Sequence, residues 1–129
     1  MAGSALDEAT LGMLDRSIEV EMLTPRRNGS ISRRPIWVVV VEGEAYVRSY
    51  LGPRSAWYRR ASVDRAAAIG LDDRTIEVGL EPISDEDLNR QVSEAYRAKY
   101  GASSPQSTES MVTPEVTGTT LRLTRPASA

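Results

Sequence analysis

Arginine and aromatic side chains, which can bind and stack on ligands, gather in one short part of the chain. Between residues 46 and 61 it reads YVRSYLGPRSAWYRRA, with Arg48 and Ser49 a few residues before Trp57 and Tyr58. A guanidinium presents a planar fork of donors that matches a phosphate or a carboxylate, and an aromatic ring offers a face on which a flat molecule stacks. These four residues are therefore candidate contacts to a flat, negatively charged ligand.

Each candidate also has an ordinary structural interpretation, which the sequence leaves open. Arg48 can form a surface ion pair with an acid on a neighbouring strand, and exposed pairs of this kind contribute at most about 1 kcal/mol. Trp57 and Tyr58 can serve as core residues. Two adjacent rings on one short helix cannot both point inward, because neighbouring positions lie on different faces. We therefore expect one of the two rings to face a groove or a partner subunit.

Positive charge is concentrated in the middle of the chain. Residues 26–60 contain eight arginines and two glutamates, whereas the whole chain has a net charge of −2. Within this segment, Arg34 stands just before an apolar run and can start a strand beside Arg48. It is either part of a solvated loop or a second contact to an anion. The negative overall charge and the lack of a known binding motif argue against a nucleic-acid partner.

The residue types that are missing exclude several kinds of chemistry. The chain has no cysteine and no histidine, so it cannot use a thiolate nucleophile, an imidazole base or a Ser-His-Asp triad. A zinc site with the usual ligands is excluded for the same reason, and we expect no metal. Any chemistry must come from acidic, hydroxyl or arginine side chains, from the single Lys99, or from a bound cofactor.

The length and the apolar pattern predict one domain that does not enter a membrane. The 129 residues match a common domain size, so we expect a single domain over 1–129. The longest apolar run, at 36–41, is far shorter than the roughly 20 residues of a membrane helix. The first residues lack the basic charge of a signal peptide. We expect a cytoplasmic protein with no membrane partner.

The periodicity of the apolar residues predicts an α+β fold built around a small antiparallel barrel of six strands, with two or three helices. Tight turns at 42–43 and 72–73 favour hairpins, and the run at 36–41 is typical of a central strand. The clearest helix is 85–100, in which Tyr96 and Tyr100 would pin it to the sheet. The Ser/Thr/Pro-rich segment 102–118 is predicted to be a flexible loop or a lid. The predicted strands are 17–22, 36–41, 44–50, 65–71, 75–83 and 119–124.

Three stretches of the chain carry a family resemblance. They are RNGSISRRPIWVVVVEGEAYVRSYLGPRSAWYRRA at 27–61, AYRAKYG at 95–101 and TTLRL at 119–123. Together they resemble the FMN-binding split-barrel superfamily, on its deazaflavin-dependent nitroreductase side. The nearest family is the bacterial domain of unknown function 2255, and the resemblance covers residues from about 17 to 125.

The resemblance implies a split β-barrel, usually a homodimer, with FMN or a deazaflavin in a groove near the subunit boundary. Carried over by position, the cofactor contacts would be Arg48, Ser49, Trp57 and Tyr58. The chain departs from the pattern at 59–61, where Arg-Arg-Ala stands in place of a frequent asparagine. Its only lysine is on the late helix rather than near the expected phosphate.

These observations lead to one main hypothesis and two alternatives. The main hypothesis is a protein that binds a flavin-type or other anionic aromatic small molecule, with Arg34 and Arg48 on the anion, and that works as an oxidoreductase if a cofactor is held. FMN, a deazaflavin and no cofactor at all are equally compatible with the sequence. The first alternative is a cofactor-independent isomerase or cyclase on a barrel that has lost its flavin. The second is a non-catalytic binding dimer.

Overall fold

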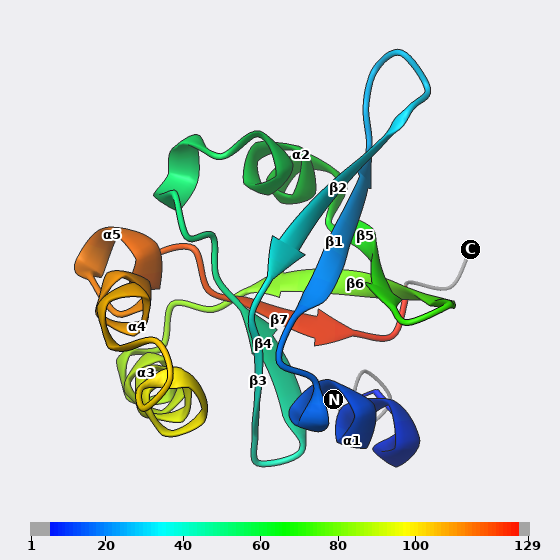
Figure 1. Ribbon diagram of the computed structural model, residues 1–129. Helices are drawn as coiled ribbons and strands as arrows, with labels where there is room; N and C mark the ends of the chain where they lie inside the picture. The colour runs from blue at the N-terminus through cyan, green and yellow to red at the C-terminus, as the bar shows by residue number, and fades with distance from the viewer. Residues whose placement is uncertain (1–5, 127–129) are drawn as a thin grey trace.

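The computed structural model describes residues 6–126. Seven strands form one curled antiparallel half-barrel, in the order β2-β1-β5-β6-β7-β4-β3 (Figure 1). The predicted α+β class and the antiparallel pairing are confirmed, but the described sheet has seven strands where six were predicted. The strands are β1 (Val20–Pro25), β2 (Ile31–Ile36), β3 (Val38–Val41), β4 (Glu44–Val47), β5 (Ala66–Leu71), β6 (Arg74–Pro82) and β7 (Leu121–Thr124).

The additional strand is β2, most of which falls between the predicted strands 17–22 and 36–41. It pairs with β1 from Val20↔Ile36 to Pro25↔Ile31. Since β2 lies at the edge of the sheet, only Ser32 and Ile36 of its side chains are buried. A strand that buries so few apolar residues lacks the alternation by which strands are recognised. The physical cause of the wrong prediction is therefore the edge position of β2.

Two hairpins are confirmed where turn residues predicted them. Glu42 and Gly43, between β3 and β4, have φ of 48° and 79°, the left-handed pair that suits a two-residue hairpin turn. Asp72, between β5 and β6, has φ 56°. The turns bring β4 back along β3 and β6 back along β5.

The sequence predicted a central strand for the run at 36–41, and this prediction is wrong. Its β3 part lies at the other edge of the sheet, next to β4. Both faces are nevertheless buried, because Val38 packs into the core inside the half-barrel and Val39 into the core outside it. Helices rather than neighbouring strands cover this edge, which explains an apolar run typical of a central strand.

The described chain also contains five α-helices, more than the two or three predicted, and one 3-10 turn, η2 (Gly52–Arg54). Two of the helices lie in the segment 102–118 that was predicted to be a loop. Both start with proline, Pro105 and Pro114, which is favourable at the first position of a helix; that the segment moves as a lid stays a prediction. The helices are α1 (Glu8–Arg16), α2 (Ala56–Asp64), α3 (Glu86–Tyr100), α4 (Pro105–Met111) and α5 (Pro114–Thr117).

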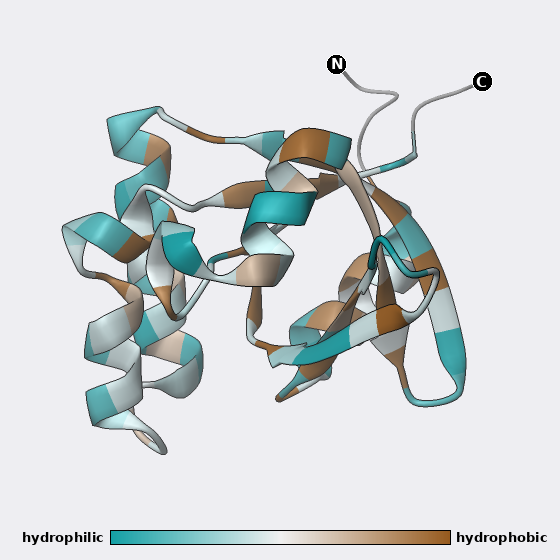
Figure 2. Cartoon of the chain, turned by 90° about the horizontal axis from the view of Figure 1, so that it is seen from above, coloured by the Kyte–Doolittle hydropathy of each residue, from teal (hydrophilic) through white to brown (hydrophobic). Residues whose placement is uncertain are grey.

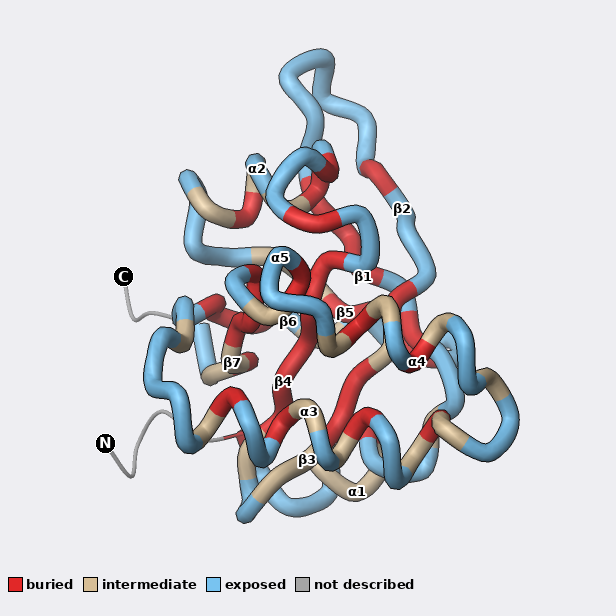
Figure 3. The backbone as a smooth tube through the Cα atoms, turned by 90° about the vertical axis from the view of Figure 1, so that its left-hand side faces the viewer, coloured by how far each residue is buried: buried red, intermediate tan, exposed pale blue. Residues whose placement is uncertain are grey.

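The helices cover the two faces of the curled sheet. The inner core contains residues of the strands together with Leu14 of α1 and Trp57 and Ala61 of α2. The outer core lies between β3–β4 and the helices α3, α4 and α5, which stand together on one side of the molecule (Figures 1 and 3). Hydrophobic residues accordingly alternate with hydrophilic ones along the strands and helices (Figure 2).

None of the helices within residues 6–126 is long and apolar enough to cross a membrane.

Candidate functional site

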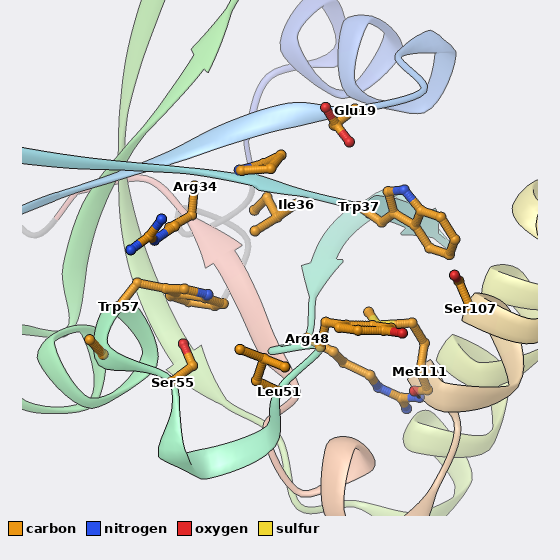
Figure 4. A pocket seen from close by; sticks show the side chains of 13 residues that line it. Glu19, Arg34, Ile36, Trp37, Arg48, Leu51, Ser55, Trp57, Ser107 and Met111 are labelled. Atoms are coloured by element: carbon orange, nitrogen blue, oxygen red, sulfur yellow. Dashed lines mark hydrogen bonds between the residues drawn. The ribbon is translucent and has the colours of Figure 1, made fainter.

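A cavity lies where β2, the start of α2, the end of β4 and α4 meet. Its volume is about 530 Å³, within the range of pockets that hold small molecules. Figure 4 shows Arg34 and Trp57 on one side, Trp37 and Ser107 on the opposite side, and Arg48 and Met111 along the base. The chain has two tryptophans, and both line this cavity.

The first wall is formed by Arg34 of β2 and Trp57 of α2. Arg34 is exposed, and its side chain makes no hydrogen bond or ion pair with the other described residues. Its neighbour Arg33 points to the opposite face of the strand, where it pairs with Glu21 at 3.1 Å. Since alternate residues of a strand face opposite sides, the strand itself directs one arginine to the cavity and the other to an acid.

Trp57 is held in the wall by the start of α2. The helix is capped by Ser55, whose hydroxyl oxygen accepts a hydrogen bond from the N–H of Tyr58 at 3.4 Å. Trp57 is 6% exposed and packs on the inner core. Because Ser55, Ala56 and Trp57 all line the cavity, the positive end of the α2 dipole is part of its wall.

The opposite wall is formed by Trp37. It is half-buried at the cavity, with its ring stacked on Tyr100 at a centroid distance of 4.0 Å and an interplanar angle of 3°. The Tyr96 hydroxyl donates to the carbonyl of Trp37 at 3.2 Å, and the Tyr100 hydroxyl donates to the carbonyl of Ile18 at 2.7 Å. The two tyrosines thus pin α3 to the sheet, as predicted, and also fix the position of the indole.

Arg48 lies at the base of the cavity with its side chain turned into the protein. It is 1% exposed, and all five of its N–H groups donate to protein oxygens. The acceptors are Thr120 Oγ1 at 2.8 Å, Ser93 Oγ at 2.9 Å, the Met111 carbonyl at 2.9 Å, and the Asn89 carbonyl and Oδ1 at 2.9 and 3.3 Å. The guanidinium therefore has no donor left to give to a ligand in this conformation.

The charge of Arg48 is not neutralised by an acid among the described residues. None of the ion pairs found within residues 6–126 includes it, so the surface pair considered from the sequence is not formed there. Burial lowers the pKa of Arg48, and Tyr96, whose ring centroid lies 5.6 Å from the guanidinium carbon, partly offsets this effect. A buried positive charge without a carboxylate raises the electrostatic potential at the base of the cavity, which favours an anion there.

Ser49 and Tyr58 are not brought into the cavity wall. Ser49 is fully buried; its hydroxyl donates to the Gly52 carbonyl at 2.7 Å, and its N–H donates to Thr119 Oγ1 at 2.9 Å. Tyr58 packs against the inner core, with its ring edge-on to Trp57 at 6.0 Å. Of the five residues predicted for ligand contact, the structure brings Arg34, Arg48 and Trp57 together at one cavity and leaves these two outside it.

Sequence reasoning missed most of the residues that line the cavity, and four of them have side chains that could contact a ligand. Glu19 precedes β1, Trp37 joins β2 to β3, and Ser107 and Met111 belong to α4. Glu19 fell in the predicted strand 17–22, and the two α4 residues fell in the predicted loop. The conspicuous signal was Trp37, since a chain with only two tryptophans has few such rings to place.

The sequence matches the family model described as "Uncharacterized protein conserved in bacteria (DUF2255)" over residues 10–123. The chain belongs to this family. The family resemblance inferred from the sequence is confirmed. No curated protein sequence matches this DUF2255 chain.

Solved structures with the same fold as this DUF2255 protein include several from bacteria. A conserved hypothetical protein of Mycobacterium tuberculosis, Rv2991, has a TM-score of 0.67 at 15% identity, with 100% of this chain and 85% of that one covered. The heme storage protein HutZ of Vibrio cholerae has a TM-score of 0.61 at 9% identity, with 97% of this chain and 92% of that one covered. A structure named F420 reductase has a TM-score of 0.52 at 16% identity, with 95% of this chain and 97% of that one covered. At these identities the likeness shows the fold alone.

Proposed function

We propose that this DUF2255 protein binds a flavin-type or other anionic aromatic small molecule in the cavity between Trp37 and Trp57. The observation that carries the proposal is the composition of the cavity wall. Two indoles and the guanidinium of Arg34, unpaired among the described residues, border one space of about 530 Å³, above the buried charge of Arg48. Rings suit a flat ligand, and the cations suit its negative group.

The residues present fit a flavin or a deazaflavin. Arg34 and the start of α2 supply donors and positive potential for a phosphate, and the indoles supply faces for stacking. Glu19, which also lines the cavity, can accept a hydrogen bond from a ring N–H. Arg48 contributes through its charge rather than through direct bonds. When bound, a flavin-type ring would supply hydride transfer, and the chain's own residues would bind it, orient it and exclude water.

Heme, the cofactor that HutZ is named for storing, fits less well. Protein-bound heme iron is most often held by His or Cys, and this chain has neither. Met111 and Tyr50 are the lining side chains that could serve instead, but Met111 is buried against the outer core. The composition therefore favours a flavin-type ligand.

We also propose that the protein is a homodimer whose second copy closes the cavity. Tyr50 and Leu51 line the cavity and are 52% and 65% exposed, so its rim is apolar and open to solvent. One structure with this fold, at a TM-score of 0.53, is described as a domain-swapped dimer. Sedimentation should give twice the chain mass of 14.1 kDa, and Leu51→Asp should give the monomer mass. A monomeric wild type would contradict the dimer.

The test of binding uses the two tryptophans as reporters. FMN added to the purified protein should quench tryptophan fluorescence to saturation, because both indoles line the cavity. Trp57→Phe keeps a stacking ring and removes one reporter, so it should reduce the quenching while preserving affinity. A matched titration with hemin separates the two cofactor classes.

An unchanged fluorescence with FMN and with the deazaflavin analogue would reject the flavin proposal. In that case the cofactor-independent isomerase and the non-catalytic dimer remain, and turnover of carbonyl substrates would distinguish them. Saturable quenching that survives Arg34→Gln unchanged would place the ligand elsewhere.

A further inference from the structure

A second concave region, here called the arginine groove, lies between the β1–β2 hairpin and α2. It is an open groove of about 620 Å³, bordered by Arg26 and Arg27 of the hairpin and Arg59 and Arg60 of the helix. Among the described residues, Asp64 is the one acid in its wall. Residues four apart lie on one helix face, so Arg60 and Asp64 share a face of α2, and Arg59 borders the groove from the adjacent face.

The arginines of the groove have few partners within the described chain. None of the ion pairs in residues 6–126 includes any of the four, although five other arginines pair with acids. The side chains of Arg27 and Arg59 form no hydrogen bond with another described residue. Asp64 shares the groove without pairing to any of them. The Arg26 guanidinium donates to Ser30 Oγ at 3.1 Å and to the Ile31 carbonyl at 3.5 Å, both neutral acceptors. The four positive charges are thus gathered without an ion pair, which costs electrostatic repulsion when no anion is bound.

Local bonds hold the groove in shape. In the hairpin loop, the Arg26 N–H donates to the Ser30 carbonyl at 2.8 Å, and Asn28 Oδ1 accepts from the N–H and hydroxyl of Ser30 at 3.0 and 2.7 Å. On the other side, Arg60 Nε donates to Thr24 Oγ1 of β1 at 3.1 Å. This bond ties α2 to the hairpin and engages none of the other Arg60 donors. The backbone that carries the four arginines and the Arg60 side chain are therefore fixed before a ligand arrives, which reduces the entropy cost of binding.

We propose that the arginine groove is a second anion-binding site that takes a compact, multiply charged phosphate compound. Four guanidiniums against one carboxylate suit several negative charges close together, and Arg binds phosphate oxygens in pairs. Ala56 borders both this groove and the cavity between Trp37 and Trp57, here called the aromatic cavity. The anion can thus be a free polyphosphate compound or a charged extension of the molecule in the cavity.

The test measures binding of inorganic tripolyphosphate to the full chain by calorimetry. We expect saturable binding that weakens as salt is raised. Arg27→Gln with Arg59→Gln should weaken it by about tenfold or more, since each charged hydrogen bond contributes strongly. Both residues are exposed, so the fold should persist, which thermal unfolding checks. The control is Arg90→Gln with Arg97→Gln, which removes the same charge from α3.

The outcomes are separate from those of the FMN titration. No binding of tripolyphosphate by the wild type, or equal weakening in both double variants, would overturn the site, since the latter shows an effect of net charge alone. Selective loss in the groove variant supports it. If FMN displaces tripolyphosphate, the site is supported and its anion is a charged extension of the cavity ligand. If the two bind independently, the site is supported and its anion is a free polyphosphate compound.

Discussion

The two sides of the aromatic cavity use arginine in opposite ways. On the side of α3 and α4, the guanidinium of Arg48 is 1% exposed and donates five hydrogen bonds to protein oxygens. On the side of β2 and α2, Arg34 is exposed and has no partner within residues 6–126. Both line the same space, yet one joins elements of the fold and the other is free to bind.

This difference indicates that unused donors, rather than proximity to the cavity alone, make Arg34 the candidate for ligand contact. Arg122 makes the same point elsewhere in the sheet, since Glu44 and Glu81 already hold it at 2.9 and 2.6 Å. Only where donors remain unpaired can a guanidinium exchange water for a ligand phosphate. Four substitutions can break or sharpen this comparison.

Arg48→Met should have the largest effect. It removes five hydrogen bonds and leaves buried acceptors, such as the Met111 carbonyl at the end of α4, without this donor. Each buried unsatisfied group costs about 1–3 kcal/mol, so the free energy of unfolding should fall by about 3 kcal/mol or more. Denaturant unfolding measures this. Arg48→Lys should recover little, because an ammonium cannot reach all the acceptors. A stable Arg48→Met variant that had lost only FMN binding would show that Arg48 contacts the ligand rather than holding the fold together.

Arg34→Gln should affect binding and leave stability intact. We expect affinity for FMN to fall by about tenfold, corresponding to about 1.4 kcal/mol, with an unchanged melting temperature, because the side chain has no partner among the described residues. Fluorescence titration measures the affinity. Arg33→Gln, one position away on the opposite face, is the matched control and should bind FMN normally. Equal losses in the two variants would contradict a specific contact.

Tyr100→Phe tests how the indole wall is held at high pH. Burial raises the pKa of Tyr100 to about 12, whereas an unfolded tyrosine ionises near about 10. The hydroxyl therefore contributes stability that is fully present below about pH 10 and is lost as pH rises towards 12. The variant should lose about 1 kcal/mol at neutral pH and unfold with a weaker alkaline dependence.

Burial also raises the pKa of Tyr96, so Tyr100→Phe should reduce the alkaline dependence without removing it. Denaturant unfolding at several pH values measures the slope. An unaltered slope would show that the Tyr100 hydroxyl is not held as described.

Arg33→Gln should have the smallest effect on stability. Its pair with Glu21 is exposed on both sides, and such pairs are weakened by solvent and salt, so the loss should stay below about 1 kcal/mol. Denaturant unfolding of the Arg33→Gln and Arg48→Met variants measures both losses of stability and so compares a paired, exposed arginine with a buried one. A loss as large as that of Arg48→Met would show that exposure does not distinguish the two.

Turns and the strongly amphipathic helix could be predicted from the sequence because their signals are local. Glu42 and Gly43 form the turn that their residue types favour, and Tyr96 and Tyr100 lie four apart on one face of α3. The strand β2 could not be predicted because an edge strand here buries only Ser32 and Ile36. Its burial depends on pairing with β1, which local pattern does not record.

The candidate site was predicted in part. Arg34 and Trp57 were identified by residue type and face the cavity. The role of Arg48 could not be inferred, because two of its acceptors are main-chain carbonyls, of Asn89 and Met111. Every residue has a main-chain carbonyl, so the sequence does not indicate which carbonyls accept a hydrogen bond from Arg48. Long-range contacts of this kind become visible only once α3 and α4 are placed against the end of β4.

The bonds of Arg48 have a consequence for how the molecule opens. One side chain joins residue 48 to residues 89, 93, 111 and 120, whose separations along the chain are 41, 45, 63 and 72. Detaching α3 or α4 alone would break the charged hydrogen bonds that Arg48 donates to that helix, which is costly. The amides of these helices should therefore exchange with solvent only when the whole domain unfolds.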